Sequence, residues 1–321
     1  SSSAASDVYK RQSAAMESVP LSPPSAPDRV SLAQRLARRG LDVTTLLLMP
    51  ALLFVLALFV YPALYGFWLS LHPMNANGVF GFGNYIAFFS DPYVYGTIFT
   101  TLELAVPVTL VNIALSVPIA LRVRHLRKQR LLTTILIIPV TLGTVLTAQG
   151  MLNFYGPLGW FNRILMTLHV IDAPVRLVHN FTGVFLSQIV SGFPFCFMLI
   201  LSYVSGIDPS LEQAASMLGA GPAARFRHIL LPLLGAGLAI TFCLAFVQAF
   251  SVFPSAVLVG SPSGPTRVIA IAAYHAAYEQ YDYSMGSAIA IIMGLVQIIV
   301  VAIVMKASAA LYRGPAAGGK G

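Results

Sequence analysis

The chain has 321 residues, of which 57% are hydrophobic and only 9% are charged, and its formal net charge at pH 7 is +8. Soluble globular proteins carry roughly 25% charged residues, because polar side chains must cover their surface. So low a charge content excludes an ordinary water-soluble domain. The composition predicts an all-α membrane protein, since a helix satisfies its own backbone hydrogen bonds in lipid.

The first 43 residues are rich in Ser, Ala and Pro, and we expect them to form a disordered cytoplasmic tail. Within this tail, residues 1–15 are interpreted as a cloning scar ahead of a natural start at Met16. The apolar run that follows continues past Tyr61 without a small-x-small cleavage signal. Residues 44–70 are therefore expected to remain as an N-terminal transmembrane helix and not to be removed as a signal peptide.

Six apolar stretches are long enough to cross a bilayer, whose hydrocarbon core of about 30 Å needs roughly 20 helical residues. They are Thr44–Ser70, Thr97–Leu121, Leu131–Asn153, Phe181–Val204, Leu233–Val257 and Met285–Met305. We expect six transmembrane helices with both chain ends, including the tail 307–321, in the cytoplasm. This orientation leaves only Arg163, Arg176 and Arg267 of the 19 Lys and Arg residues outside, in agreement with the positive-inside rule. It also accounts for the positive net charge without a nucleic-acid partner.

The predicted cytoplasmic segment 205–232 contains the signals of a short helix that is capped at both ends. Asp208 is a good N-cap, and Pro209 suits the first helical position. Ser210–Leu218 is predicted to be helical and to end at Gly219, which readily adopts the left-handed conformation of a helix C-cap. A short rigid element of this kind is suited to dock on a soluble partner.

The same segment resembles the EAA loop of bacterial ABC importer permeases. The family pattern is Glu-Ala-Ala, three residues, Gly, nine residues and Ile-x-Leu-Pro, and it is matched in register by Ala214, Ala215, Gly219, Ile229, Leu231 and Pro232. Gln213 stands where the family usually has Glu, and Glu212 directly precedes it. An ordinary amphipathic linker between two helices is the alternative interpretation of this segment.

The resemblance implies that segment 205–232 is a coupling loop whose helix inserts into a cleft on an ATP-binding subunit. It assigns this contact to Asp208, Glu212, Gln213, Ala214, Ala215, Gly219, Ile229, Leu231 and Pro232. Because Gln213 is uncharged, we expect either Glu212 or a neutral hydrogen bond to replace the salt bridge that a Glu would make. Residues 97–306 are expected to form the permease transmembrane domain, with the type I importer (MetI-like) fold.

The same resemblance implies the partners of the chain and its place in the cell. The expected partners are a dimer of ABC ATPase subunits, a second permease subunit that is a paralogue, and a periplasmic or extracellular substrate-binding protein, all at the bacterial inner membrane. The chain itself is expected to be non-catalytic, with no cofactor and no metal, because ATP is bound by the partner. Its C-terminal GPAAGGKG lacks the Ser or Thr of a phosphate loop, and its histidines lack metal-ligand spacing.

Two further segments resemble the spermidine/putrescine-type permeases. Residues 155–177 contain a Gly-x-Leu-x-x-x-Asn stretch and an Ile-Asp-x-Pro element, and residues 282–288 resemble the entry of those permeases into their last span. This resemblance implies that the substrate is a polyamine or a related small cation. Importers of the same class for sugars, aminophosphonates or other small solutes share much of this frame and are the alternative.

The candidate substrate path consists of Glu103, Phe246, Gln248 and Phe250. Glu103 is the only acidic residue in the six spans, and a carboxylate at the bilayer centre costs roughly 2.5–3.5 kcal/mol unless it faces a cavity. The phenylalanines could stack on an ammonium chain, or they could form a packing stripe. A secondary carrier driven by an ion gradient is a less favoured alternative, because it needs ionisable relays and usually internal repeats.

Overall fold

The computed structural model describes residues 43–74, 79–126, 129–141 and 143–311, and every regular element in these ranges is helical. Residues 1–42, which include the predicted scar, and residues 312–321 of the predicted C-terminal tail lie outside the described part. The chain divides into two compact units, residues 1–62 and residues 63–321. The described residues of the first unit form α3 (Val43–Val55), the π-helical η1 (Leu56–Val60) and the first two residues of α4 (Tyr61–Ser70).

Five continuous helices in the described residues are long and apolar enough to cross a membrane, and a bent helix pair raises the number to six. The continuous candidates are Leu47–Ser70, Pro92–Val123, Phe181–Ser205, Pro222–Phe250 and Tyr283–Ala310. Each overlaps one of the stretches that the sequence predicts. The fourth candidate starts before Leu233 because α12 (Pro222–Arg225) and the π-helical η3 (Phe226–Leu230) lead directly into α13 (Leu231–Phe250).

The predicted third span, Leu131–Asn153, is not one straight helix. It consists of α7 (Gln129–Thr141) and α8 (Gly143–Tyr155), and the segments Gln129–Ile138 and Gly143–Thr167 on either side of the break are bent by 83°. Gly143 has a φ of 76°, a left-handed conformation that glycine adopts without steric cost. Hydropathy alone does not reveal this break, because both halves are apolar.

The predicted fifth span, Leu233–Val257, is also interrupted. Helix α13 ends at Phe250, and the short helix α14 (Pro254–Leu258) follows after a break. Pro254 has no N–H to donate and disfavours the α conformation at the residue before it. Phe253 accordingly has φ −131° and ψ −58°, outside the helical range.

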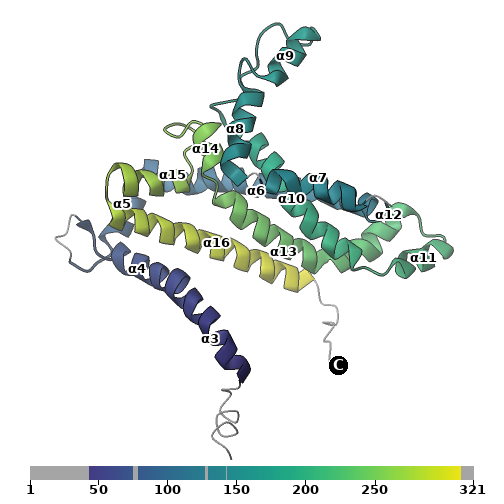
Figure 1. The fold of residues 1–321 in the computed structure, drawn as a ribbon, viewed down its shortest axis with the longest axis horizontal. Coiled ribbons are helices and arrows are strands. Elements are labelled where there is room, and N and C mark those ends of the chain that lie inside the picture. Colours follow the sequence, from purple (N-terminus) through teal and green to yellow (C-terminus); the bar gives the residue numbers. More distant parts are fainter. Residues whose placement is uncertain (1–42, 75–78, 127–128, 142, 312–321) are drawn as a thin grey trace, which may run out of the picture. The chain divides into compact units, whose positions relative to one another are not determined.

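The second unit is a bundle built around α6 (Pro92–Val123) and α10 (Phe181–Ser205), which pack along each other. Helix α13 packs against both of them and against α16 (Tyr283–Leu311), and Figure 1 shows α10, α13 and α16 side by side. The remaining elements are α5 (Gly83–Ser90), α9 (Trp160–Thr167), α11 (Pro209–Met217), α15 (Ile269–Tyr274) and η4 (His275–Glu279). At the start of α6, Asp91 accepts a hydrogen bond of 2.9 Å from the N–H of Tyr93 and so caps the helix.

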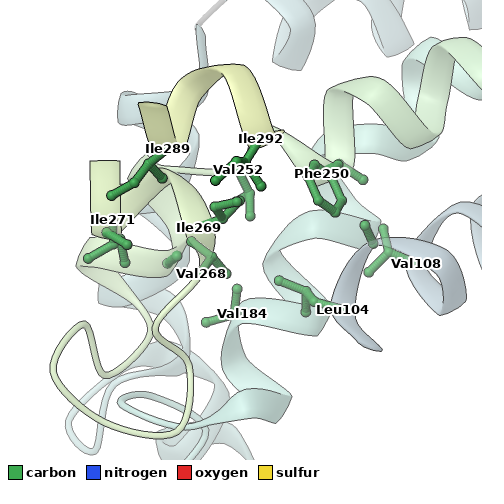
Figure 2. Packing of buried hydrophobic residues seen from close by; sticks show 14 of the residues in the cluster. Leu104, Val108, Val184, Phe250, Val252, Val268, Ile269, Ile271, Ile289 and Ile292 are labelled. Carbon is green, nitrogen blue, oxygen red and sulfur yellow. The ribbon is translucent and has the colours of Figure 1, made fainter. Parts of the chain in front are cut away.

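The main hydrophobic core lies where α6, α10, α13, α15 and α16 meet (Figure 2). Leu104 and Val108 of α6 and Val184 of α10 face Phe250, Ile269 and Ile289 across this core. Lipid tails are as apolar as these side chains, so close packing and not the hydrophobic effect holds such helices together in a membrane. A second cluster, around Phe197 of α10 and Leu234 of α13, joins the opposite ends of the same helices.

Candidate coupling helix and membrane pocket

Helix α11 is a short helix with a cap at each end, as the sequence predicts. The Asp208 carboxylate accepts a hydrogen bond of 2.8 Å from the N–H of Ser210, and Pro209 occupies the first helical position. The helix spans Pro209–Met217, and Gly219 then adopts the left-handed conformation with φ 84°. The predicted capped helix is therefore confirmed, with a boundary shift of one residue.

The N-cap of α11 stays charged at physiological pH. The hydrogen bonds from the backbone N–H and the side chain of Ser210 favour the carboxylate and lower the pKa of Asp208 below its ordinary value. A negative charge at this position also interacts favourably with the positive end of the helix dipole. This cap is local, because it joins Asp208 to Ser210 only two residues further along the chain.

The free surface of α11 is uncharged and partly apolar. Met217 and Leu218 are each 89% exposed, and Gln213 and Ala214 are exposed beside them. Glu212 is the one acidic residue in α11. Among the described residues it forms an ion pair with Arg124 at the end of α6. The sequence analysis missed Met217 and Leu218, although two adjacent large apolar residues at the end of a short cytoplasmic helix are a recognisable signal of a protein contact.

The second half of the EAA-like motif belongs to a different structural element from the first half. Ala214 and Ala215 lie on α11, whereas Ile229 lies in η3, and Leu231 and Pro232 begin α13. Leu231 and Pro232 line an apolar groove between α13 and α16. The motif thus covers the short helix α11 and the start of the long apolar helix that follows it, and Figure 1 shows α11 and α12 near the ends of α10 and α13.

A pocket with an uncharged lining, in which apolar residues and seven neutral polar residues alternate, lies between α6, α8, α10 and the break after α13. Its empty volume, including the open mouth, is about 540 Å³. The polar residues that line it are Asn112, Thr144, Gln188, Ser191, Gln248, Ser251 and Ser255. All of these side chains are amides or hydroxyls, and no residue in the lining is charged.

Hydrogen bonds hold several of these groups in place. Gln188 donates to the carbonyl of Ala249 at 3.4 Å, and the Ser251 hydroxyl accepts a hydrogen bond of 2.9 Å from Gln297 of α16. Asn112 is only 2% exposed, and its Oδ1 has no hydrogen-bond partner among the described residues. An unpaired buried amide oxygen is costly, so Asn112 is poised to accept a hydrogen bond from a solute or a water in the pocket.

The structure separates the four residues of the predicted substrate path. Gln248 lines the pocket, but Phe246 and Phe250 are 0% exposed inside the core and offer no face to a solute. Their helical spacing reflects the packing stripe, which was the alternative interpretation. Glu103 is exposed, and it lies nine residues from Asn112 on α6, about half a turn out of phase at 3.6 residues per turn. The carboxylate therefore points away from the pocket.

The two segments that resemble polyamine permeases have structural explanations that involve no solute. The fully buried Asn162 donates to the carbonyls of Gly156 and Val175 at 3.0 and 3.1 Å, and its Oδ1 accepts from the N–H of Val175 at 2.9 Å. Asp282 accepts from the N–H of Met285 at 2.9 Å and so caps the start of α16. Both motifs thus fix the backbone, and neither indicates a substrate.

A helical bundle with two interrupted spans, a capped short helix and an uncharged pocket between its helices is consistent with the membrane subunit of a transporter. The model of the family described as "Binding-protein-dependent transport system inner membrane component" matches residues 108–314. The chain belongs to this family. It is therefore the permease subunit of a binding-protein-dependent ABC importer in the inner membrane, and it is not the subunit that hydrolyses ATP.

Similar permeases cover almost the whole chain. The trehalose/maltose transport system permease protein MalF of Thermococcus litoralis is 29% identical over 274 residues, which are 82% of this chain and 92% of that protein. The trehalose transport system permease protein SugA of Mycobacterium tuberculosis is 25% identical over 273 residues, 83% of this chain and 88% of that protein. The sn-glycerol-3-phosphate transport system permease protein UgpA of Yersinia enterocolitica is 26% identical over 268 residues, which are 79% of this chain and 89% of that protein.

The fold is that of the type I (MetI-like) permeases. A chain of a bacterial alginate ABC transporter, solved in complex with an alginate pentasaccharide-bound periplasmic protein, aligns with a TM-score of 0.73 at 21% identity. The alignment covers 88% of this chain and 98% of that one. None of the relatives described here is a polyamine permease, so the expected polyamine substrate gains no support from them. They favour the alternative of a sugar or another small solute.

Proposed function

We propose that this permease imports a sugar or a related uncharged, polyhydroxylated solute. In this proposal a second permease subunit, a paralogue, completes the path, a binding protein delivers the solute from outside, and two ATPase subunits that bind the ATP dock on α11. The observation that supports the proposal is that the lining of the pocket carries no charged residue and that Asn112, Gln188 and Gln248 supply amides to it.

The chemistry of the lining suits hydroxyl groups better than ions. A sugar hydroxyl both donates and accepts, and amide and hydroxyl side chains can answer it in both roles. A polyamine would need a carboxylate to offset the loss of its hydration, and an anion would need a cationic side chain. Glu103 lies on the opposite face of α6, so it does not supply such a charge to this pocket.

The relatives support the same substrate class. Two of the similar permeases are described as trehalose or trehalose/maltose transporters, and the solved neighbour is described with an alginate oligosaccharide. The sn-glycerol-3-phosphate permease is similar over nearly the same length, so one of the relatives is described as a permease for an anionic polyol. The uncharged lining is the reason to favour a neutral solute for this chain.

Uptake into proteoliposomes tests the proposal directly. The chain would be purified with its partner permease, ATPase and binding protein, and uptake of radiolabelled trehalose, maltose, spermidine and glycerol 3-phosphate would be compared with ATP inside the vesicles. We expect ATP-dependent uptake of at least one of the two sugars and none of spermidine. Uptake of spermidine or glycerol 3-phosphate without sugar uptake would refute the proposed substrate class.

A pair of matched variants tests whether the pocket is on the path. Gln248→Ala removes one amide from the lining and should lower sugar uptake about tenfold, the kinetic equivalent of one lost hydrogen bond of about 1.4 kcal/mol. Gln149 is an exposed glutamine of α8 that does not line the pocket, so Gln149→Ala is the control. Equal uptake by both variants would remove the pocket from the path.

A further inference from the structure

One arginine connects the coupling helix to two membrane helices. Arg124 lies at the C-terminal end of α6, and its guanidinium forms an ion pair with Glu212 of α11. The same guanidinium donates a second hydrogen bond, of 3.4 Å, to the backbone carbonyl of Val204 near the end of α10. The ends of α6, α10 and α11 are thus joined through a single side chain.

The pair is well shielded from water. The side chain of Arg124 is 6% exposed and that of Glu212 is 19% exposed. Burial lowers the pKa of Arg124, but the ordinary value is so far above neutrality that the group remains charged. An ion pair that is mostly withdrawn from solvent is screened little by salt, and removing one partner leaves the other charge buried and unpaired. This contact is therefore more than a surface salt bridge.

The two helices that Arg124 joins are the ones that form much of the pocket. Asn112 lies on α6, and Gln188 and Ser191 lie on α10. Helices α6 and α10 pack along each other over most of their length. A displacement applied to their ends can therefore reach the pocket through the packed pair, because close-packed helices move as rigid elements.

The position of Glu212 also decides what α11 offers to a partner. Glu212 is engaged by Arg124, so it is not free to replace the glutamate that Gln213 lacks. The exposed residues of α11 and its C-cap are Pro209, Ser210, Leu211, Gln213, Ala214, Ser216, Met217 and Leu218. Of the two sequence-based expectations, the structure favours a neutral contact at Gln213.

We propose that Arg124 and Glu212 are a positioning pair that transmits movement of α11 to α6 and α10, and hence to the pocket. This inference rests on the proposed function, in which an ATPase docks on α11. The pair touches no solute and no nucleotide, and its role is to keep three helix ends in fixed register while α11 is displaced. Apart from the pair, the described residues join α11 to the rest of the chain through the linkers 206–208 and 218–221 and through its packing on α12.

The test needs a readout that does not depend on the substrate. Cys196 and Cys243 are both free, so a background with Cys196→Ser and Cys243→Ser would carry Gln248→Cys as a reporter in the pocket. The rate at which a water-soluble maleimide alkylates this cysteine would be measured in the full complex, without nucleotide and after trapping with ATP and vanadate. ATP hydrolysis by the same preparations would be measured in parallel.

The variants are Arg124→Ala, Glu212→Gln and the charge exchange Arg124→Glu with Glu212→Arg. In the first two variants, we expect ATP hydrolysis to stay within about twofold of the parent. The effect of nucleotide on the alkylation rate should be about tenfold smaller than in the parent, which is within the usual range of a coupling between sites. The charge exchange should restore at least part of the response. Arg122→Ala is the matched control, because Arg122 is an exposed arginine at the same end of α6.

Several outcomes would overturn the inference. They are a normal alkylation response in Glu212→Gln, a parallel loss of response and ATP hydrolysis in both single variants, or no recovery in the charge exchange. If Arg124→Ala does not assemble, Glu212→Gln, which keeps the shape of the side chain, decides the question. The protein with its natural Gln248 tests the proposed function: if it hydrolyses ATP but transports no sugar, while the Gln248→Cys reporter shows the response, the substrate class fails and the positioning pair stands.

Discussion

Gly192 of α10 faces Asn112 of α6 so closely that a Cβ atom on residue 192 would lie 2.6 Å from the Asn112 Nδ2 atom. No real Cβ makes so short a contact, so any larger residue at position 192 must displace the amide. Asn112 is buried, and its Oδ1 is the unpaired acceptor in the pocket. The absence of a side chain at residue 192 therefore determines where the amide of Asn112 points.

Gly192→Ala should change the pocket more than the stability of the fold. The methyl group meets the end of a side chain and no backbone atom, so rotation of Asn112 can relieve the contact. We expect sugar uptake to fall about tenfold, as for the loss of one hydrogen bond, and the free energy of unfolding to fall by less than about 1 kcal/mol. Uptake and thermal unfolding in detergent measure the two effects.

A double-mutant cycle identifies the cause of this loss. If Gly192 acts through Asn112, then Gly192→Ala has no further effect once Asn112→Ala is present. Gly96→Ala, in a helical glycine of α6 with open space around it, is the control and should leave uptake unchanged. Additive losses in the double variant would show that Gly192 acts on something other than the amide.

Gly219→Ala is expected to loosen the end of α11 through backbone strain alone. Gly219 has φ 84° and nothing within 4 Å of its virtual Cβ, so the substitution causes no clash but forces a left-handed conformation that costs about 1–2 kcal/mol. Gly221 has equally open space without the left-handed φ, so Gly221→Ala is a close control. Uptake should fall in Gly219→Ala and recover in Gly219→Asn, since Asn tolerates this conformation. Equal behaviour of the two alanine variants would contradict the role of the cap.

Local sequence signals were sufficient for α10 and α11, because each of these helices is bounded by its own cap. Asn180 accepts from the N–H of Gly183 at 2.8 Å and starts α10 at Phe181, the residue predicted. The prediction ended α10 at Val204, and the helix ends at Ser205. The EAA-like spacing likewise located α11 and its glycine. The family and its fold were predictable because the EAA-like motif is also a local sequence pattern.

Features that depend on distant parts of the chain were not predictable. Arg124 and Glu212 are 88 residues apart in sequence, and no pattern marks them as partners. The helical spacing of Phe246 and Phe250 placed both rings on one face of α13, but the packing of α6, α15 and α16 decides that this face is buried. The substrate path was predicted from the residues most suited to a cation, whereas the structure places neutral amides around the pocket.

Asp208→Ala should increase hydrogen exchange in α11. The variant loses the acceptor for the Ser210 N–H, whereas Asp208→Asn keeps one and should resemble the parent at neutral pH. Because folding lowers the pKa of Asp208, its stabilising effect is complete above the ordinary value of about 3.9 and is lost as the pH falls through the lower folded value. Hydrogen exchange of peptides from 209–218, corrected for intrinsic rates, measures this. A cap that weakens between pH 7 and pH 5 would be inconsistent with the lowered pKa.

Asn162→Ala should release the turn between residues 156 and 175. In the variant the N–H and the carbonyl of Val175 lose the Asn162 amide, whereas the Gly156 carbonyl still accepts from the N–H of Gly159; each lost hydrogen bond costs about 0.5–1.5 kcal/mol. We expect faster hydrogen exchange across 156–175 and a lower unfolding temperature. Asn153→Ala, at an exposed residue of α8, is the control. An unchanged exchange pattern in Asn162→Ala would mean that other contacts hold this turn.

Glu103→Gln distinguishes the pocket from the path first predicted for a cation. Because Glu103 points away from Asn112 on α6, removing its charge should leave sugar uptake within about twofold and should not change which solutes are accepted.

Gln248→Glu is the reciprocal change and brings a carboxylate into the pocket lining, at a cost of up to about 2.5–3.5 kcal/mol at the membrane centre. This second variant should transport sugar poorly. Of the two variants, Gln248→Glu is the one in which we expect spermidine to compete with sugar uptake. The comparison is made by uptake in the same proteoliposomes. A large loss in Glu103→Gln with normal uptake in Gln248→Glu would reverse the assignment and place the path along the exposed face of α6.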